Sequence, residues 1–425
     1  MTVSTDARGL DLRAFLRRGD HIVWGQACGE PTTLVEALIA QAESIGELSA
    51  FAATSFSGLL GAKAWESLNL SSMGAIGALR AVAAAGRLGI VPCHVSQVGP
   101  MIEQGLIGCD VAFVQVSPPD ANGNHSFGLI SDFVQAAVAK ARVVIAEVNE
   151  CVPFTHGDAV LPAARIDCAV QVARALVEVL PAQISETDLA IAKTVAGYVE
   201  DGSVLQVGIG AVPDAILRLV HDRRDLGVHS GMIGDGLVDL VEAGVVTNAL
   251  KPIDAGVSIT GALIGSKRLY AFVHQNPRIG MRDSSYTHNA AVLSRLTRLV
   301  TINSAIEVDL TGQVNAEQSG TQYLGGTGGQ VDYVRAGSRS PGGHSIIALP
   351  ATAKGGKLSR ITALLSGPVT TARSEVDVIV TEFGAAELKG QTLAERARRL
   401  AAIAHPDFRE ELDRSAHAIQ KRGFS

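Results

Sequence analysis

The sequence is poor in aromatic and charged side chains. Aromatic residues make up 4% of the 425 residues and charged residues 18%, whereas hydrophobic residues make up 47% and glycine occurs 45 times. So much apolar volume can form a large core, which excludes a disordered or fibrous chain. The length exceeds that of most single domains and fits two. We therefore expect a tightly packed α/β protein with many glycine turns.

The sequence also lacks a block of basic residues and a long apolar run. The net charge is −6, and no segment is rich enough in lysine or arginine to favour nucleic acid or an anionic membrane. The most apolar stretch, residues 73–90, is interrupted by Arg80 and Arg87, which is unfavourable in a bilayer. Residues 1–20 alternate charged and apolar side chains without a signal-peptide core. We expect a cytoplasmic protein with no nucleic-acid partner and no membrane partner.

Cysteine and histidine patterns do not fit the common metal sites. The five cysteines all lie in the first half of the chain, and neither CxxC nor a mixed cysteine–histidine spacing occurs. The histidines show no HxxxH spacing either. We therefore expect reduced thiols, no metal and no permanently bound cofactor.

Apolar strand patterns alternate with helical segments along the whole chain. This alternation predicts mostly parallel sheets with helices on both faces. Ser185 followed by Asp188 resembles a capping box, so a helix is expected to begin there. We place the domain boundary just before it and predict two α/β domains, residues 1–183 and 184–425. The clearest predicted strands are His21–Gly25, Asp110–Val116, Ala141–Val148, Val204–Val207, Leu299–Asn303 and Val376–Glu382.

The stretch Asp201–Gly236 has the features of a ligand-binding edge. The strand Val204–Val207 leads into Gly208-Ile209-Gly210, and Pro213 marks the first position of the next helix. A proline stands where a GxGxxG fingerprint needs its third glycine, so a Rossmann site does not fit. Backbone N–H groups of this loop and of the helix start can still bind phosphate or stabilise an oxyanion. A tight turn without a ligand explains the local sequence equally well.

A second glycine cluster, Gly325–Gln330, has more glycines than a simple turn needs. Close approach of a ligand and simple flexibility both explain it. No Gly-Lys-Ser/Thr follows, which excludes a Walker A loop, and no Gly-x-Ser-x-Gly elbow occurs in the chain. Three acidic residues, Glu147, Glu307 and Glu382, stand at the ends of predicted strands. Each of them fits a nucleophile, a base or a salt-bridge partner.

Ordered segments from about Gly25 to Phe408 resemble one family. The sequence is similar to the acetyl-CoA hydrolase/transferase family, which includes 4-hydroxybutyrate, butyrate–acetate and succinate–acetate CoA-transferases. The segments that carry the resemblance are VSPPDANGNHSFG (Val116–Gly128), VVIAEVN (Val143–Asn149), THGD (Thr155–Asp158), LQVGIGAVPDAIL (Leu205–Leu217), Leu226–Asn248, INSAIEVDLTGQVN (Ile302–Asn315), GGTGGQVDY (Gly325–Tyr333), VTEFGAAELKG (Val380–Gly390) and IAHPDFR (Ile403–Arg409).

The resemblance implies two open α/β domains of the CoA-transferase type with the active site between them. In this family a glutamate attacks the acyl-CoA thioester, an acyl–glutamyl anhydride and then a glutamyl-CoA thioester form, and a second carboxylic acid takes the CoA. The implied substrates are acyl-CoA and a small carboxylic acid or water, and a homodimer is permitted. The residues that resemble the family's CoA-contacting elements are Gly208, Ile209, Gly210, Ala211, Val212, Asn303, Gly326, Gly328 and Gly329.

One position departs from the family pattern. The family's nucleophile lies in a motif like H-[ST]-E-M, and this chain has His229-Ser230-Gly231-Met232. Gly231 carries no side chain, so the usual anhydride cannot form there and the covalent route is lost. His229, Asp235 and Glu307 are the candidates to position a different attacking group.

Three functions are compatible with this substitution. The first is direct transfer or hydrolysis of an acyl-CoA thioester without the glutamyl-CoA intermediate. The second is a CoA- or acyl-carrier-binding protein without turnover. The third is a repurposed acyl-thioester enzyme that catalyses transacylation or cyclisation. We favour catalysis because most of the site motif is retained.

Overall fold

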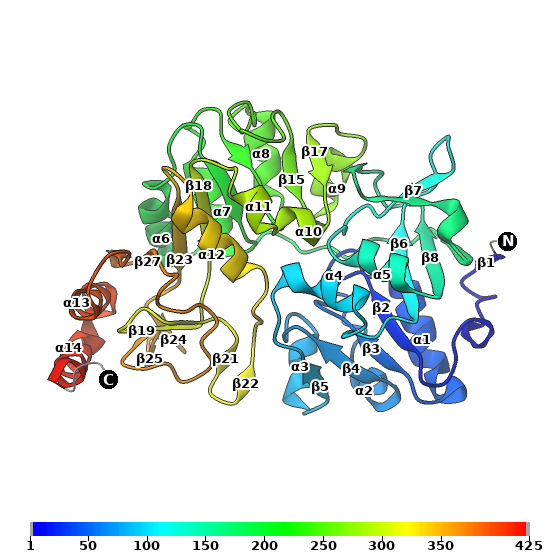
Figure 1. Ribbon diagram of the computed structural model, residues 1–425, viewed down its shortest axis with the longest axis horizontal. Coiled ribbons are helices and arrows are strands. Elements are labelled where there is room, and N and C mark those ends of the chain that lie inside the picture. The colour runs from blue at the N-terminus through cyan, green and yellow to red at the C-terminus, as the bar shows by residue number, and fades with distance from the viewer. Residues whose placement is uncertain (1–2, 422–425) are drawn as a thin grey trace. The chain divides into compact units, whose positions relative to one another are not determined.

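The computed structural model describes residues 3–421, which fold into two compact α/β units (Figure 1). The first unit comprises the chain up to Leu180 together with Gly231–Asp235 and Val257–Asn289, and the second comprises the rest. The mostly parallel sheets of both units confirm the predicted fold class. The units differ from the sequence-based domains 1–183 and 184–425 because two later segments form strand pairs inside the first unit.

The first unit is built on a sheet of eight strands, and every neighbouring pair in it is parallel. The strands are β1 (Val3–Asp6), β2 (His21–Trp24), β3 (Ser49–Phe51), β4 (Asn69–Ser72), β5 (Leu88–Ile90), β6 (Val111–Val116), β8 (Val143–Asn149) and β11 (Cys168–Val172). Their order in the sheet is β1-β11-β8-β6-β2-β3-β4-β5. The central strands β6 and β8 are buried along their whole length, as expected for strands covered on both faces.

Helices supply the crossover connections that parallel neighbours require. The longest in the first unit, α1 (Thr32–Ile45), buries Leu34 and Leu38 in the same core cluster as Ile22 and Phe113 of the sheet. The shorter helices of this part of the chain are η1 (Leu12–Ala14), α2 (Ala62–Ser67), α3 (Leu79–Ala84), α4 (Val95–Glu103), α5 (Val134–Lys140) and η2 (Ala163–Arg165).

Short strands complete the first unit and include the two segments that return to it. β7 (Asn124–Ser126) pairs with β10 (Val160–Pro162), and β14 (Met232–Ile233) pairs with β16 (Ala262–Leu263). β17 (Ile279–Met281) lies between β15 (Ser258–Thr260) and β9 (His156–Gly157). The helices of the returning segment are α9 (Lys267–Val273) and α10 (Ser284–Thr287).

The second unit has a sheet of six strands, of which five are parallel. In sheet order they are β13 (Gly227–Val228), β12 (Val204–Val207), β18 (Leu299–Asn303), β23 (His344–Ala348), β27 (Val378–Thr381) and the antiparallel edge strand β28 (Gly384–Glu387). Its helices are α6 (Glu186–Ala196), α7 (Ala211–Leu219), α8 (Gly236–Glu242), α11 (Ala290–Leu293), α12 (Gln330–Arg339), α13 (Leu393–Ile403) and α14 (Pro406–Lys421). The capping box predicted at Ser185 is present: Ser185 Oγ accepts from Asp188 N at 3.2 Å, and Asp188 Oδ2 accepts from Ser185 N at 2.9 Å.

Short strands follow the carboxyl ends of the second sheet. β19 (Glu307–Asp309) lies between β20 (Val314–Asn315) and β26 (Ile361–Thr362). Two small hairpins are formed by β21 (Gln318–Ser319) with β22 (Gln322–Tyr323), and by β24 (Thr352–Ala353) with β25 (Leu358–Ser359). These elements appear together in yellow to orange in Figure 1.

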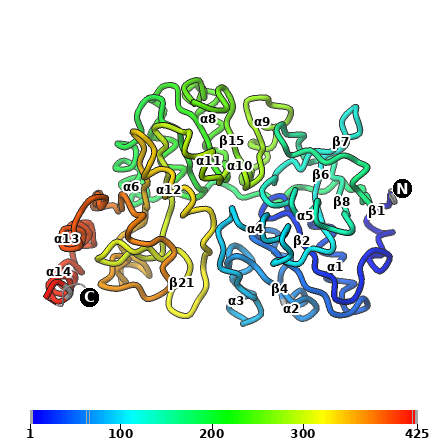
Figure 2. The backbone as a smooth tube through the Cα atoms, in the orientation of Figure 1, coloured from blue at the N-terminus to red at the C-terminus, as the bar shows by residue number. Residues whose placement is uncertain are grey.

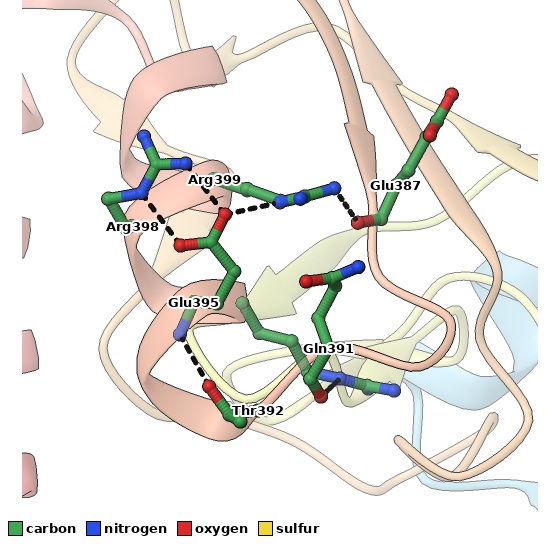
Figure 3. A network of polar contacts seen from close by, with 7 residues as sticks. Glu387, Gln391, Thr392, Glu395, Arg398 and Arg399 are labelled. Carbon is green, nitrogen blue, oxygen red and sulfur yellow. Dashed lines mark hydrogen bonds and ion pairs between the residues drawn. The ribbon is translucent and has the colours of Figure 1, made fainter.

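The two C-terminal helices, drawn in orange to red in Figure 2, pack against each other and are anchored by a polar network. Thr392 Oγ1 accepts from Glu395 N at 3.3 Å and caps α13 (Figure 3). The Glu395 carboxylate accepts from Arg398 and Arg399, and these hydrogen bonds lower its pKa to about 2. Arg399 Nη1 in turn donates to Glu387 O at 2.8 Å, which connects α13 to the edge strand β28.

No helix within residues 3–421 combines the length and the hydropathy that a membrane span needs. The five cysteines are unpaired thiols, and of these only Cys151 is exposed.

Candidate functional site

The first part of the candidate site is the loop Gly208–Gly210 at the carboxyl end of β12. Gly210 has φ 117° and ψ −176°, a conformation that side-chain-bearing residues rarely adopt. A Cβ at Gly208 or at Gly210 would meet no heavy atom of the described residues within 4 Å, so this face of the loop is open. The helix α7 follows directly, and its first-turn N–H groups have no acceptor inside the helix. Open N–H groups of this kind can bind phosphate or a developing oxyanion.

The predicted start of this helix at Pro213 is wrong by two residues. α7 begins at Ala211, and Pro213 is its third residue. The ring is accommodated because a proline in the first turn lacks only an N–H group that would have no helical partner there. Asp214 N donates to Gly210 O at 2.9 Å and closes the first turn.

The second part is the end of β13, where His229 and Ser230 are fully buried. His229 N donates to Leu205 O at 3.1 Å and extends the pairing of β13 with β12. Ser230 Oγ donates to Val207 O at 3.1 Å and accepts from Val207 N at 3.4 Å. Ser230, which precedes Gly231, is therefore hydrogen-bonded directly to Val207, which precedes the Gly208–Gly210 loop.

A buried lysine lies under the same strand end. Lys251 Nζ donates to Val228 O at 3.0 Å, and burial lowers the pKa of this ammonium group to about 8. A Cβ at Gly227 would be 2.7 Å from Lys251 Cγ, so glycine is required for the lysine side chain to pass. No sequence pattern pointed to Lys251, because a single lysine in a turn is usually solvated.

Gly231 itself begins a segment that belongs to the first unit. Gly231 O accepts from Gly261 N at 3.2 Å, and the following residues form β14 beside β16. A Cβ at Gly261 would lie 3.2 Å from Gly231 O, so a small residue is favoured opposite Gly231.

Asp235 is held by the start of α9. Its Oδ2 accepts from Ser266 N at 2.8 Å and its Oδ1 accepts from Ser266 Oγ at 2.6 Å. A Cβ at Gly265 would lie 2.5 Å from Asp235 Oδ2, so the loop approaches the carboxylate closely. Both oxygens thus already accept a strong hydrogen bond, and a role for Asp235 in positioning an attacking group stays a prediction.

Asn303 is the last residue of β18, and Glu307 is the first residue of the short strand β19 that follows it. Glu307 is buried, and its Oε1 accepts from Asn315 Nδ2 at 2.9 Å, from Ser366 N and Oγ at 2.7 and 2.9 Å, and from Gly367 N at 3.2 Å. Asn303 Nδ2 donates to Gln206 Oε1 at 3.1 Å across the β12–β18 pair. Glu307 therefore holds the loop around Ser366 in place, and its role in positioning an attacking group stays a prediction.

The Gly325–Gly329 loop has two kinds of glycine. A Cβ at Gly325 would be 2.2 Å from Ala316 O, so Gly325 is needed for backbone packing. Gly328 has φ 56° and no close neighbour, so its conformation and not its surroundings favours glycine. The loop leads into α12, whose first residue Gln330 donates from Nε2 to Thr371 Oγ1 at 3.1 Å. An open left-handed glycine before a helix start again leaves backbone groups accessible.

Glu147 does not stand at a strand end as predicted. It is the fifth of the seven residues of β8, and its Oε2 accepts from Thr33 N at 2.8 Å and from Leu34 N at 3.3 Å. Burial raises the pKa of this carboxyl group, and the N–H groups of α1 favour its charged form. Glu147 thus caps α1. Glu382 does follow β27, and its Oε2 accepts from Ala351 N at 2.8 Å.

Two further buried acids in the first unit had no sequence signal. Ser55 Oγ donates to both oxygens of Glu30, at 3.1 and 3.0 Å, and burial raises the Glu30 pKa. Gln26 Nε2 donates to Asp132 Oδ2, Phe133 N donates to Asp132 Oδ1 at 2.6 Å, and burial raises the Asp132 pKa to about 6. Both acids fasten the loops that follow β2.

Within the described chain, no three histidine, cysteine, aspartate or glutamate side chains are arranged to hold a metal ion. The candidate groups for contacting a ligand are therefore the backbone N–H groups of the glycine loops and the buried carboxylates.

Comparisons with known proteins match nearly the whole chain to one family. The acetyl-CoA hydrolase/transferase N-terminal domain matches residues 11–181, and the C-terminal domain of the same family matches residues 265–416. The 4-hydroxybutyrate coenzyme A transferase of Clostridium kluyveri is 40% identical over 396 residues, which cover 92% of each chain.

Solved structures give the same result for the fold. RipA from Yersinia pestis superposes with a TM-score of 0.91 at 32% identity, covering 98% of this chain and 97% of RipA. The 4-hydroxybutyrate CoA-transferase of Porphyromonas gingivalis superposes with a TM-score of 0.83 at 35% identity, covering 99% and 98%. The chain belongs to the acetyl-CoA hydrolase/transferase family.

Proposed function

We propose that the protein processes acyl-CoA thioesters by direct attack of a small carboxylic acid or water, without a glutamyl-CoA intermediate. The observation that carries this proposal is Gly231, which we align with the nucleophilic glutamate of the family motif. Membership of a family of CoA-transferases and acetyl-CoA hydrolases supports acyl-CoA as the substrate.

The chemistry balances without an enzyme carboxylate. When water attacks, its oxygen bonds to the thioester carbonyl carbon, the C–S bond breaks, and CoA leaves as the thiolate and takes up a proton. When an acid attacks, its carboxylate displaces the thiolate and forms a mixed anhydride. The thiolate then attacks the carbonyl carbon of the incoming acid and releases the original acid, which gives net CoA transfer.

The backbone loops supply what this route needs most. An oxyanion forms on the thioester carbonyl in each attack, and preorganised N–H donors stabilise such a charge in the transition state. The open Gly208–Gly210 loop and the start of α7 offer donors of this kind. Asp235 and Glu307 already accept hydrogen bonds from their own loops, which favours a water molecule or the acceptor acid itself as the attacking group.

The decisive experiment is a trapping assay on the full-length protein. A panel of acyl-CoAs is incubated with and without small acids, and free thiol and CoA exchange are followed. Peptide mass spectrometry after borohydride or hydroxylamine treatment then searches for a modified glutamate. We expect thioester consumption and no modified glutamate, and detection of a glutamyl-CoA adduct would contradict the proposal. Binding of CoA without any consumption would assign the protein to CoA binding alone.

Gly231→Glu tests whether only the nucleophile is missing. We expect this variant to form a trappable glutamyl-CoA adduct and to exchange CoA by the two-step covalent route. Gly231→Gln is the matched control, because it has nearly the same volume and no nucleophilic carboxylate. A glutamate variant that behaves like the glutamine variant would show that position 231 does not face the thioester.

A further inference from the structure

The strands of the second sheet end at one edge, and several loops meet there. β12, β18, β23 and β27 are parallel, so their carboxyl ends at Val207, Asn303, Ala348 and Thr381 lie on the same side. In open α/β sheets, ligands bind outside the carboxyl ends of the strands. Arg360 also lies at this edge, and within the described chain its side chain has no hydrogen-bond partner other than Ala305 O.

Arg360 is held firmly by its backbone. It stands between β25 and β26, its N–H donates to Ala351 O at 2.8 Å, and its carbonyl accepts from Val308 N at 2.8 Å. Its side chain donates from Nη1 to Ala305 O at 3.4 Å. Ala305 follows the end of β18 and Ala351 follows the end of β23, so the guanidinium group lies near the edge where these two paired strands end.

The Arg360 guanidinium group interacts with the charge of Glu382 but forms no ion pair with it. Its Nε is buried and has no hydrogen-bond partner among residues 3–421, and the side chain forms no ion pair with a carboxylate of that range. Burial lowers the Arg360 pKa, and the charge of Glu382, whose Oε2 accepts from Ala351 N, offsets only part of this effect. Because an arginine side chain keeps its proton in proteins, the half-buried group stays a cation.

Such a cation is unfavourable unless an anion joins it. Removing a charged group from water costs free energy that a hydrogen-bonded counter-ion offsets. Elsewhere in the second unit, Arg399 pairs with Glu395 and the exposed Arg335 pairs with Glu375, whereas the buried Arg396 donates to the carbonyl oxygens of Thr311 and Arg373. Arg360 differs from both kinds of arginine, because its side chain has no ion pair and only one hydrogen bond, at 3.4 Å to Ala305 O, while its Nε has no partner among residues 3–421.

We propose that Arg360 binds a non-reacting anionic group of the substrate, either a second carboxylate on a dicarboxylic acid or a phosphate of CoA. This inference rests on the proposed function, because it places a substrate at this edge. β12 and β18 are neighbours in the sheet, and paired strands are about 4.8 Å apart. The Gly208–Gly210 loop follows β12 and Ala305 follows β18, so one substrate can reach both the loop and Arg360.

Calorimetric titration of the full-length protein with two ligand pairs tests this assignment and identifies the source of the anion. Succinate and butyrate have the same number of carbon atoms and differ by one carboxylate, whereas CoA carries phosphates and an adenosine that pantetheine lacks. The variants are Arg360→Gln, Arg360→Lys and the control Arg335→Gln, which removes an exposed arginine charge from α12 of the same unit. Thioester consumption is measured on the same samples.

We expect Arg360→Gln to lose about 10- to 100-fold in affinity for the more anionic member of one pair, since charge-assisted hydrogen bonds have this strength. The less anionic member should bind as before, Arg360→Lys should retain part of the affinity, and Arg335→Gln should match the wild type. Equal losses of affinity for both members of each pair, or no loss at all, would overturn the assignment of Arg360. The proposed function would still stand in that case if the wild type consumes the thioester. If the wild type binds no member of either pair and consumes no thioester, the assignment and the proposed function are both wrong.

Discussion

The carboxyl edges of the two sheets differ in the groups that they leave open to a ligand. In the first unit the loops after β2 are fastened by buried acids, with Glu30 bound to Ser55 and Asp132 bound to Gln26. In the second unit the corresponding edge has open glycines at Gly208 and Gly210 and an arginine without a counter-ion. The buried acids fasten the loops of the first edge, whereas the second edge leaves backbone donors and an arginine side chain for a ligand.

The largest effect is expected where the open edge depends on glycine. Gly210→Ala forces a side chain into a conformation that is almost restricted to glycine and turns the loop's N–H groups away from the substrate. We expect about a 100-fold loss in kcat for thioester consumption, comparable with the loss of one oxyanion donor. Steady-state kinetics at saturating acyl-CoA measures it.

Gly208→Ala is the matched control for this loop. A Cβ at Gly208 meets nothing within 4 Å among the described residues, so the variant should fold and melt like the wild type. If Gly210→Ala turned over acyl-CoA at the wild-type rate, the loop would not be the oxyanion cradle, and the contrast between the two edges would disappear.

Truncation of a buried acid should destabilise the first edge more than the second. Glu30→Ala leaves a cavity and removes the acceptor of the Ser55 hydroxyl group, which is expected to cost about 2–4 kcal/mol of the free energy of unfolding. Glu382→Ala removes one hydrogen bond from a half-buried carboxylate and is expected to cost about 1 kcal/mol. Urea unfolding measures the loss in free energy of unfolding for each variant. Equal losses would show that the two acids stabilise their edges to the same extent.

The pH dependence of stability tests the buried acid Asp132. Its pKa is raised from 3.8 to about 6 in the folded protein, so the folded state holds the proton more tightly than the unfolded state. The stability gained from the protonated carboxyl group is present at acid pH and is lost as the pH rises from about 4 through about 6.

Asp132→Asn removes this titration and keeps a hydrogen-bonding amide beside Gln26, whose own amide can rotate to match. Relative to the wild type, the variant should gain up to about 3 kcal/mol of stability between acid and neutral pH. Urea unfolding at about pH 4 and about pH 8 measures the difference. A constant difference between variant and wild type at both pH values would contradict a raised pKa.

The smallest effect is expected at the exposed network on α13. Glu395→Gln removes the partner of Arg398 and Arg399, but surface ion pairs contribute little to stability. The melting temperature should stay close to that of the wild type, and any small difference should vanish at high salt. A large decrease would mean that the link from Arg399 to Glu387 holds the edge strand β28 in place.

Much of the regular structure was predictable because its causes are local. The predicted strands Val204–Val207 and Leu299–Asn303 coincide with β12 and β18, and the capping box at Ser185 was read from two residues. The predicted strand Val376–Glu382 is shorter in the structure, where β27 spans Val378–Thr381. Strand ends depend on the pairing partner, which the sequence does not display.

The rest depended on contacts between distant residues. The return of Val257–Asn289 to the first unit is made by strands of two or three residues, which are too short to give a periodic pattern. Glu147 was expected at a strand end, but its role is set by α1, more than a hundred residues earlier. Arg360 is one charged residue between two short strands, and its lack of a counter-ion exists only in the folded protein. The roles of His229, Asp235 and Glu307 stay predictions, and the trapping assay tests the loss of the nucleophile at Gly231.

The pairing of β9 with β17 has a consequence for synthesis on the ribosome. Gly157 lies against Met281, and a Cβ at Gly157 would be 2.1 Å from Met281 O, so the two backbones are in direct contact. More than a hundred residues must be translated after β9 before its partner exists, which takes on the order of ten seconds at about 5–20 residues per second. The nascent first unit therefore waits with one strand edge uncovered, and a fragment ending at residue 183 would never cover it.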